Sequence, residues 1–246
     1  MGTDRPLKIV LTNDDGIDAP GIRHLEDAVA DLGDIFVVAP ANEVSGWGHR
    51  VTTDSPLLVT DRGDRRFSVE GTPADCTRIA LTQIIPDADL ILAGINSGAN
   101  LGADVFTSGT LAAAREAVLM GRPAIALSQY RRRDVPLDWE RARRWTREIV
   151  TAIVDGNWER GATVGLWSAT FPALRPEDEE PKVVECPVDT NSLEIVFEET
   201  SSQNTPTPEN VREYMYRGVY DRRPRTRGSD VDVCFEGSIA LSHIQL

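Results

Sequence analysis

The first half of the chain repeats one pattern: a short apolar run, a polar loop rich in small residues, and a segment with apolar residues at helical spacing. Apolar runs of strand length that lack polar alternation are typical of strands buried in a parallel sheet. The expected strands are residues 8–12, 35–39, 89–93 and 123–128, and the expected helices are residues 22–33, 72–84, 110–120 and 138–154. Strands that alternate with helices predict right-handed crossovers and a three-layer α/β fold with a mostly parallel sheet.

The second half of the chain is richer in strand-like segments. The expected strands are residues 164–170, 183–186, 193–197, 231–235 and 239–244. Residues 201–208 are polar and contain prolines, which is typical of a mobile loop. We therefore expect a single domain over residues 1–246, with an α/β core at about 7–170 and a β-rich extension at about 171–246 that serves oligomerisation.

Composition limits the kind of protein. With 246 residues and 41% apolar composition, the chain is long enough for one large core. The three cysteines lie far apart, so neither a disulfide framework nor a zinc site is expected. No apolar run approaches the roughly 20 residues that cross a bilayer, and no signal peptide is recognisable. The sequence favours a cytoplasmic protein that does not contact membranes.

The charge balance is strongly acidic. Asp and Glu number 39 against 26 Lys and Arg, a formal net charge of −13, and only Lys8 and Lys182 are lysines. Such a surface repels nucleic-acid backbones, which argues against a nucleic-acid polymer as partner. Acidic, lysine-poor surfaces suit a high-salt cytoplasm, where self-repulsion is screened. A halophilic archaeal source is therefore one hypothesis, and an ordinary acidic mesophilic protein is the alternative.

Four loops carry polar residues where strands end or a helix begins. They are residues 13–16 (NDDG), 45–49 (SGWGH), 94–100 (GINSGAN) and 108–110 (SGT). Ligands of open α/β sheets collect beyond the carboxyl ends of the strands, so these loops are expected to share one crevice. Each loop also has an ordinary explanation, as a turn, a flexible loop or a plain helix cap.

The residue types favour a cation site beside an anion site. Adjacent carboxylates at Asp14 and Asp15 repel each other unless a cation lies between them, and Asn96 offers the neutral oxygen that hard cations accept. Gly46 allows close approach of the backbone to a ligand, and Ser45 adds a hydroxyl. A helix that begins after Ser108 presents free N–H groups to an anion.

Five segments, taken in order and spacing, resemble the SurE family of survival-protein nucleotidases. They are KIVLTNDDGIDAPGI, VVAPANEVSGWGH, VEGTPADC, ILAGINSGANLGADVFTSGT and GRPAIALS, which span about residues 7–128. The resemblance implies a Rossmann-like α/β core, a β-hairpin extension, and a C-terminal segment exchanged between subunits in homodimers or homotetramers. It also implies metal-dependent hydrolysis of nucleoside 5′- and 3′-monophosphates to nucleoside and phosphate.

The resemblance assigns site residues by position in this sequence. The metal ligands are expected at Asp14, Asp15, Ser45 and Asn96, and they hold one Mg²⁺ or Mn²⁺ per subunit. Asp14, Asp15 and Asn96 are expected to act in catalysis, and either aspartate is a candidate general base. Phosphate or substrate contacts are expected from Asn13, Gly46, His49, Ser108, Gly109 and Thr110.

Two positions depart from the family pattern, and other functions stay open. Ala41 and Arg50 replace residues usual in the family, and the segment after Tyr130 diverges, which puts nucleoside preference in doubt. A signalling receiver domain is disfavoured because the strand ends at Asn96 and Ser128 carry neither the phosphoacceptor Asp nor the Lys that it needs. A non-catalytic nucleotide-binding stress protein and a short-chain polyphosphatase remain as alternatives.

Overall fold

The computed structural model describes residues 5–157, 165–200 and 210–245. Within them nine strands form one sheet in the order β3-β4-β2-β1-β5-β6-β7-β11-β8, and β9 and β10 form a separate two-stranded ribbon. The strands are β1 (Leu7–Thr12), β2 (Gly33–Pro40), β3 (Val59–Asp61), β4 (Arg66–Val69), β5 (Leu90–Asn96), β6 (Ala124–Gln129), β7 (Leu166–Phe171), β8 (Val183–Glu185), β9 (Phe197–Thr200), β10 (Glu213–Tyr216) and β11 (Ile239–Ile244). The helices are α1 (Pro20–Val29), α2 (Pro73–Ile79), the π-helical turn η1 (Ala80–Ile84), α3 (Asp104–Thr107), α4 (Gly109–Leu119), α5 (Trp139–Asn157), the 3₁₀ turn η2 (Tyr220–Arg222) and α6 (Asp230–Phe235).

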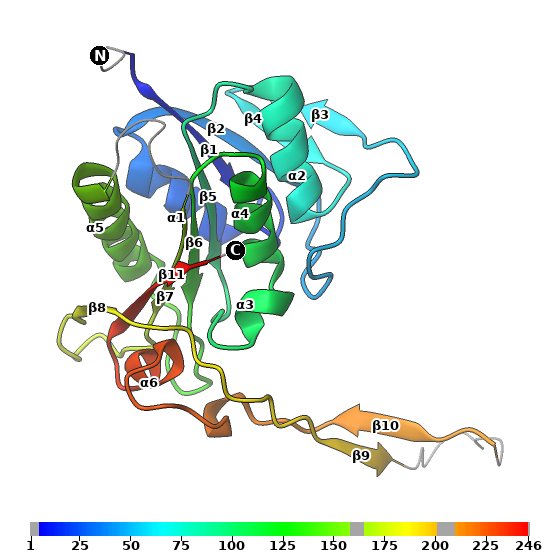
Figure 1. Cartoon of the computed structure of the whole chain (residues 1–246), viewed down its shortest axis with the longest axis vertical. Coiled ribbons are helices and arrows are strands. Elements are labelled where there is room, and N and C mark those ends of the chain that lie inside the picture. The colour runs from blue at the N-terminus through cyan, green and yellow to red at the C-terminus, as the bar shows by residue number, and fades with distance from the viewer. Residues whose placement is uncertain (1–4, 158–164, 201–209, 246) are drawn as a thin grey trace.

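The sheet is mostly parallel and covered on both faces, as the sequence predicts. Within the nine-stranded sheet of the described residues, only the β3–β4 and β7–β11 pairs run antiparallel. Helices α1 and α5 pack on one face of the sheet and α2 and α4 on the other (Figure 1). The central strands are buried from both sides, and Ile9, Leu11 and Leu92 are fully inaccessible to solvent. This is the Rossmann-like three-layer α/β fold.

Local signals in the sequence account for the helix starts. Thr72 accepts a hydrogen bond from the backbone of Asp75, and Asp75 accepts one from the backbone of Thr72, which forms a capping box ahead of Pro73. Ser108 caps α4 by accepting from the backbone N–H of Leu111. The start of α4 follows directly on α3, so the polar loop after β5 leads straight into a helix N-terminus.

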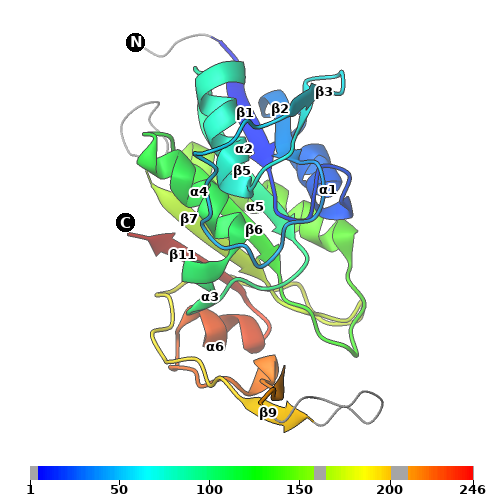
Figure 2. The same cartoon turned by 90° about the vertical axis from the view of Figure 1, so that its right-hand side faces the viewer.

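The residues after Phe171 divide between two places. Strands β8 and β11 extend the central sheet, whereas β9 and β10 project away from it beyond α6 (Figures 1 and 2). The strand expected at residues 193–197 begins only at Phe197, and the loop expected at 201–208 lies outside the described residues. A role in oligomerisation stays a prediction.

One expected strand is a helix. Residues 231–235 lie in α6, whose N-cap is Ser229, with Asp230 and Asp232 in the first turn. A serine cap and early acidic residues stabilise a helix N-terminus, and here they outweigh the β-propensity of the valines.

In the described part of the chain, no helix has the length and apolar character needed to span a membrane.

Candidate active site

The candidate site lies where the order of the strands reverses. Strand β1 pairs with β2 on one side and with β5 on the other, and both pairs are parallel. The chain moves outward from β1 to β2 and β4, then returns through α2 to β5 on the opposite side. The loops after β1 and β5 therefore separate and leave a crevice at their carboxyl ends, the usual ligand position in such sheets.

A cavity of about 570 Å³ occupies this crevice. It is lined by Asp14, Asp15, Glu43, Ser45, Gly46, Asn96, Ser97, Ala99, Asn100, Asp104, Thr107, Ser108, Gly109, Arg131 and Tyr220. All four residues expected to hold a metal are in this lining. The four loops singled out in the sequence all contribute to the cavity, because parallel strands end at the same edge of the sheet.

Asp14 is the most buried carboxylate of the lining, with 5% of its surface exposed. Its Oδ1 accepts a 2.6 Å hydrogen bond from the hydroxyl of Thr110. Burial raises the pKa of Asp14 to about 6, the Thr110 hydrogen bond opposes that rise, and the neighbouring charge of Asp15 adds to it. Burial therefore makes the ionised form of Asp14 less favourable than in water, and positive charge supplied nearby would stabilise that form.

The N-terminus of α4 touches this carboxylate. A Cβ atom built on Gly109 would lie 2.9 Å from Oδ2 of Asp14, which is closer than real Cβ contacts allow. Glycine at this position lets the first turn of α4 approach Asp14 directly. The first N–H groups of a helix have no partner within the helix, so this turn offers free donors at the cavity wall.

The loop after β5 holds Asp15 and Asn96 together. Oδ2 of Asp15 accepts from the backbone N–H of Ser97 at 3.2 Å. Nδ2 of Asn96 donates to the carbonyl of Gly98 at 2.8 Å, which leaves the Asn96 Oδ1 as the free end of the amide. Burial raises the pKa of Asp15, and the Ser97 hydrogen bond lowers it in part.

Strand β5 bulges just before Asn96 because of a glycine. Gly94 has φ +142°, and a Cβ there would meet the carbonyl oxygen of Leu127 at 2.3 Å. The pairing register of β5 with β6 shifts between Ala93 and Asn96. The bulge changes the direction of the end of β5 and places Asn96 at the cavity.

The loop of Ser45 is joined to the first loop through the backbone. The N–H of Val44 donates to the carbonyl of Asp14 at 2.9 Å. Ser45 and Gly46 follow in exposed positions at the cavity rim. Ser45 is therefore the one expected metal ligand that stands at the solvent side.

Three expected substrate contacts do not line the cavity. The amide of Asn13 donates to the carbonyl of Gly16 and holds the turn that presents the two aspartates. Thr110 is fully buried, and its hydroxyl is directed to Asp14. Both residues support the carboxylates from behind instead of facing a ligand.

The third, His49, lies against α4. Its Nε2 is 2.7 Å from Oε2 of the buried Glu116, whose other oxygen accepts from Nε of Arg78 at 2.6 Å. Nη1 of Arg115 lies 3.3 Å from Nδ1 of the same imidazole. These contacts tie the Ser45 loop to α4, which makes His49 a support of that loop in this structure.

The lining also contains residues that the sequence does not single out. Glu43 lies two residues before the expected ligand Ser45, so its position along the chain is a usable signal, whereas Ser97 belongs to the loop at 94–100 that the sequence already indicates. Arg131 follows β6 and lies 3.4 Å from the Ser97 hydroxyl, measured from its Nη1. Tyr220 comes from the distant C-terminal part of the chain, and no sequence pattern connects it to the cavity.

The charges of the lining fit a divalent cation. Asp14, Asp15 and Glu43 face Arg131, and Asp104 is paired with Arg223. A phosphate would meet net negative charge here unless a cation intervened. Among the described residues, no group of three or more His, Cys, Asp or Glu side chains is arranged for a metal. The donor set is therefore two carboxylates with neutral oxygens, which suits Mg²⁺ or Mn²⁺ better than softer metals.

Fold and site together define a class of protein. A doubly covered parallel sheet carries paired aspartates and a helix N-terminus at its switch point, the arrangement of an α/β protein that handles anionic ligands. The family profile described as "Survival protein SurE" matches residues 9–192. The chain belongs to the SurE family.

Individual relatives agree with this assignment over nearly the whole chain. A protein from Nostoc sp. is 42% identical over 245 residues, covering 98% of this chain and 100% of the relative. The "5'-nucleotidase SurE" of Erythrobacter litoralis is 36% identical over 247 residues, covering 98% of this chain and 94% of the relative. A crystal structure of the SurE protein from Aquifex aeolicus matches with a TM-score of 0.81 at 27% identity, covering 97% of this chain and 93% of that chain. These relatives are bacterial and give no support to a halophilic archaeal source.

Proposed function

We propose that this protein is a metal-dependent phosphomonoesterase, a 5′-nucleotidase that hydrolyses nucleoside 5′-monophosphates, and also 3′-monophosphates, to nucleoside and phosphate. One observation carries the proposal. The buried carboxylate of Asp14 and the N-terminus of α4 meet at Gly109 inside the cavity that also contains Asp15 and Asn96. A cation position and a phosphate position thus adjoin, which is what phosphate-ester hydrolysis requires. The "5'-nucleotidase SurE" name of the Erythrobacter relative supports the same activity.

Asp14, Asp15, Ser45 and Asn96 would hold one Mg²⁺ or Mn²⁺ per subunit. When bound, such an ion supplies Lewis-acid activation and charge neutralisation for phosphoryl transfer. The raised pKa of the buried Asp14 supports this assignment, since a nearby cation would favour its ionised form. Thr110 fixes the orientation of that carboxylate through its 2.6 Å hydrogen bond.

The substrate phosphate would be held by the start of α4. The N–H of Gly109 belongs to the first turn of α4, where backbone N–H groups have no partner within the helix, so it would donate to the phosphate. The Ser108 hydroxyl accepts from Leu111 and can still donate its own proton. Arg131 is the one cation in the lining and would attract the anion to the cavity mouth. Thr110 takes no part in phosphate contact in this scheme, because its hydroxyl is committed to Asp14.

The nucleoside would extend toward the cavity rim, where two aromatic side chains are exposed. Trp47 follows the lining residue Gly46 and is 53% exposed, and Phe106 precedes the lining residue Thr107 and is 72% exposed. The guanidinium of Arg50 lies 4.8 Å from the centre of the Trp47 ring. An exposed indole next to a phosphate site suits stacking with a nucleobase.

The proposal includes a homodimer or a homotetramer. The ribbon of β9 and β10 projects from the core (Figure 2). It exposes large apolar side chains of the kind that a second copy would cover, namely Phe197, Tyr214, Met215 and Tyr216. Nucleic-acid polymers and membranes are not proposed as partners, given the net charge of −13.

The proposed location is the cytoplasm, and three free buried cysteines agree with it. The lysine-poor acidic surface agrees with function at high salt.

A substrate panel tests the function. The purified protein is assayed with every nucleoside 5′- and 3′-monophosphate and with short polyphosphate, in Mg²⁺, Mn²⁺ or EDTA, at low and high KCl. Metal-dependent release of phosphate from the nucleotides, abolished by EDTA, is the expected result. Binding of AMP without phosphate release would instead indicate a non-catalytic nucleotide-binding protein. Faster hydrolysis of polyphosphate than of any nucleotide would replace the proposed substrate.

A further inference from the structure

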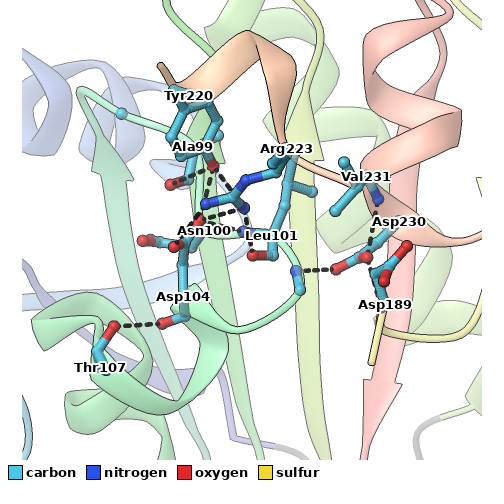
Figure 3. A network of polar contacts seen from close by, with 12 residues as sticks. Ala99, Asn100, Leu101, Asp104, Thr107, Asp189, Tyr220, Arg223, Asp230 and Val231 are labelled. Carbon is cyan, nitrogen blue, oxygen red and sulfur yellow. Dashed lines mark hydrogen bonds and ion pairs between the residues drawn. The ribbon is translucent and has the colours of Figure 1, made fainter. Parts of the chain in front are cut away.

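The loop between Asn96 and Ser108 is held from outside by the C-terminal part of the chain. Residues 97–107 begin directly after the candidate site residue Asn96 and end directly before Ser108, and α3 is their only regular structure. Figure 3 shows Tyr220, Arg223 and Asp230 converging on this loop from the segment that follows the projecting ribbon. Inside the loop, backbone hydrogen bonds form the turn that leads into α3, and the contacts from the C-terminal segment are added to this turn.

Asp104 is the main attachment point. Its Oδ2 accepts from the Tyr220 hydroxyl at 2.7 Å and from Nη1 of Arg223 at 2.9 Å. Its Oδ1 accepts from Nη2 of Arg223 at 3.1 Å, so the guanidinium binds the carboxylate through two parallel hydrogen bonds. The same Nη1 donates to the carbonyl of Leu101 at 3.0 Å, and the Tyr220 hydroxyl lies 3.4 Å from the carbonyl of Ala99.

These contacts are largely shielded from solvent. The side chain of Arg223 is 10% exposed, and its guanidinium lies 3.9 Å from the centre of the Tyr220 ring. Tyr130 and Phe235 pack against that ring, with centroids at 5.9 and 6.1 Å. Burial, followed by the charge of Asp104, raises the pKa of Tyr220 far above its ordinary value, so its hydroxyl stays a donor. Hydrogen bonds to the partly buried, ionised carboxylate of Asp104 are stronger than contacts between neutral groups at the surface.

A second attachment lies two residues earlier. Oδ2 of Asp230 accepts from the N–H of Gly102 at 2.8 Å, and its Oδ1 accepts from the N–H of Asp189 at 2.7 Å. Asp189 is fixed in turn by the hydroxyl of Ser229 at 2.6 Å. The loop is therefore held at residues 102 and 104 by groups from a single C-terminal segment.

We propose that Tyr220 and Arg223 are positioning residues for the cavity: through Asp104 they set the spacing between Asn96 and the N-terminus of α4. The expected effect on catalysis rests on the proposed function. The expected effect on the order of residues 97–107 does not depend on that function. Displacement of a metal or phosphate contact by about 1 Å is enough to reduce catalysis strongly, even when the displaced residue touches no reacting atom. The contacts also link the base of the projecting ribbon to the site, because Tyr220 lines both the site and a neighbouring cavity of about 350 Å³ that contains Val196 and Tyr216.

The test compares Tyr220→Phe and Arg223→Lys with matched exposed controls, Tyr214→Phe and Arg212→Lys. Tyr220→Phe keeps the ring and removes the hydroxyl, and Arg223→Lys keeps the charge and removes the bidentate geometry. Asp104→Asn is a third variant that acts on the shared acceptor. Amide hydrogen exchange of residues 97–107 is measured on the full-length protein without metal, followed by the Kd for Mn²⁺ alone, and then kcat and KM for AMP.

We expect exchange in residues 97–107 to become roughly tenfold faster in each of the three variants and to stay unchanged in the controls. We also expect weaker Mn²⁺ binding and a kcat lower by about tenfold, with the melting temperature little changed. Exchange equal to that of the controls would overturn the proposal. A fall in melting temperature with unaltered kcat would do so as well, since it would indicate a purely structural role. If the wild-type protein released no phosphate at all, the proposed function would be wrong. The hydrogen-exchange result would still decide whether Tyr220 and Arg223 order residues 97–107.

Discussion

The hydroxyl of Thr110 donates a 2.6 Å hydrogen bond to Oδ1 of Asp14 and so joins the first turn of α4 to the loop after β1. The two residues are far apart in the sequence, and both are buried. This contact places the helix that would bind phosphate directly beside the carboxylate that would bind metal. It also changes the role of Thr110 from the expected substrate contact to a support for Asp14.

Removal of the Thr110 hydroxyl should impair the site without unfolding the protein. Thr110→Val keeps the shape of the side chain but leaves Asp14 without this donor, so its pKa should rise further and its hold on a metal weaken. We expect kcat/KM for AMP to fall by about tenfold or more, the usual scale for a lost hydrogen bond to a charged group. Thr110→Ser restores the donor and should recover most of the activity. Activity equal to wild type in Thr110→Val would remove this role.

Neutralisation of either candidate metal-binding carboxylate should abolish metal-dependent activity. Asp14→Asn and Asp15→Asn remove the negative charge and leave the size unchanged, and we expect activity with AMP and p-nitrophenyl phosphate, in added Mn²⁺, to fall by at least about 100-fold. Asp18→Asn is the matched control, because Asp18 lies just beyond the same loop, is exposed and pairs with Arg62. Full activity in both variants would refute the assignment of the metal site.

Loss of the Trp47 ring should weaken nucleotide binding selectively. Base stacking on an aromatic side chain contributes about 1–3 kcal/mol, so Trp47→Ala should raise KM for AMP by roughly tenfold and leave kcat nearly unchanged. Hydrolysis of β-glycerophosphate, which has no base, should be unaffected, and Trp47→Phe should retain part of the affinity. Leu58→Ala provides an exposed apolar control outside the cavity lining. Equal increases in KM for both substrates would contradict a base-stacking role.

Asp75 should make stability sensitive to acid. Although burial opposes its ionisation, hydrogen bonds from Thr52 and Thr72 hold the pKa of Asp75 below its ordinary value of 3.8. The folded state therefore binds fewer protons than the unfolded state, so the stabilisation is present above pH 3.8 and is lost as the pH falls through the lower, folded-state pKa. Asp75→Asn replaces an acceptor with a donor that faces N–H groups, and we expect a loss of about 1–3 kcal/mol at pH 7.

Urea unfolding at pH 7 and near pH 2 measures this effect. The difference in unfolding free energy between wild type and Asp75→Asn should shrink at the lower pH, because the stabilisation by the ionised carboxylate is lost as the pH falls below 3.8 toward the lowered pKa of the folded state. A difference independent of pH would show that the ionised form of Asp75 contributes nothing to stability.

The sequence determined the layers of the fold and the edge of the sheet where the site lies. Apolar runs at residues 35–39 and 89–93 are local signals of buried parallel strands, and the caps at Thr72 and Ser108 are local signals of helix starts. Because parallel strands end at one edge, the polar loops that follow them had to meet there. Residues 231–235 show the limit of such reasoning, since apolar composition alone predicted a strand where a serine cap starts α6.

Only the tertiary structure decided which way each polar side chain faces and what holds the loops in place. Thr110, Asn13 and His49 lie in the expected loops, yet each is directed to a protein partner instead of the cavity. Tyr220 reaches Asp104 across 116 residues of sequence. The physical reason is that side-chain direction and long-range pairing depend on which surfaces pack together, whereas hydrophobic periodicity and capping are properties of a few consecutive residues.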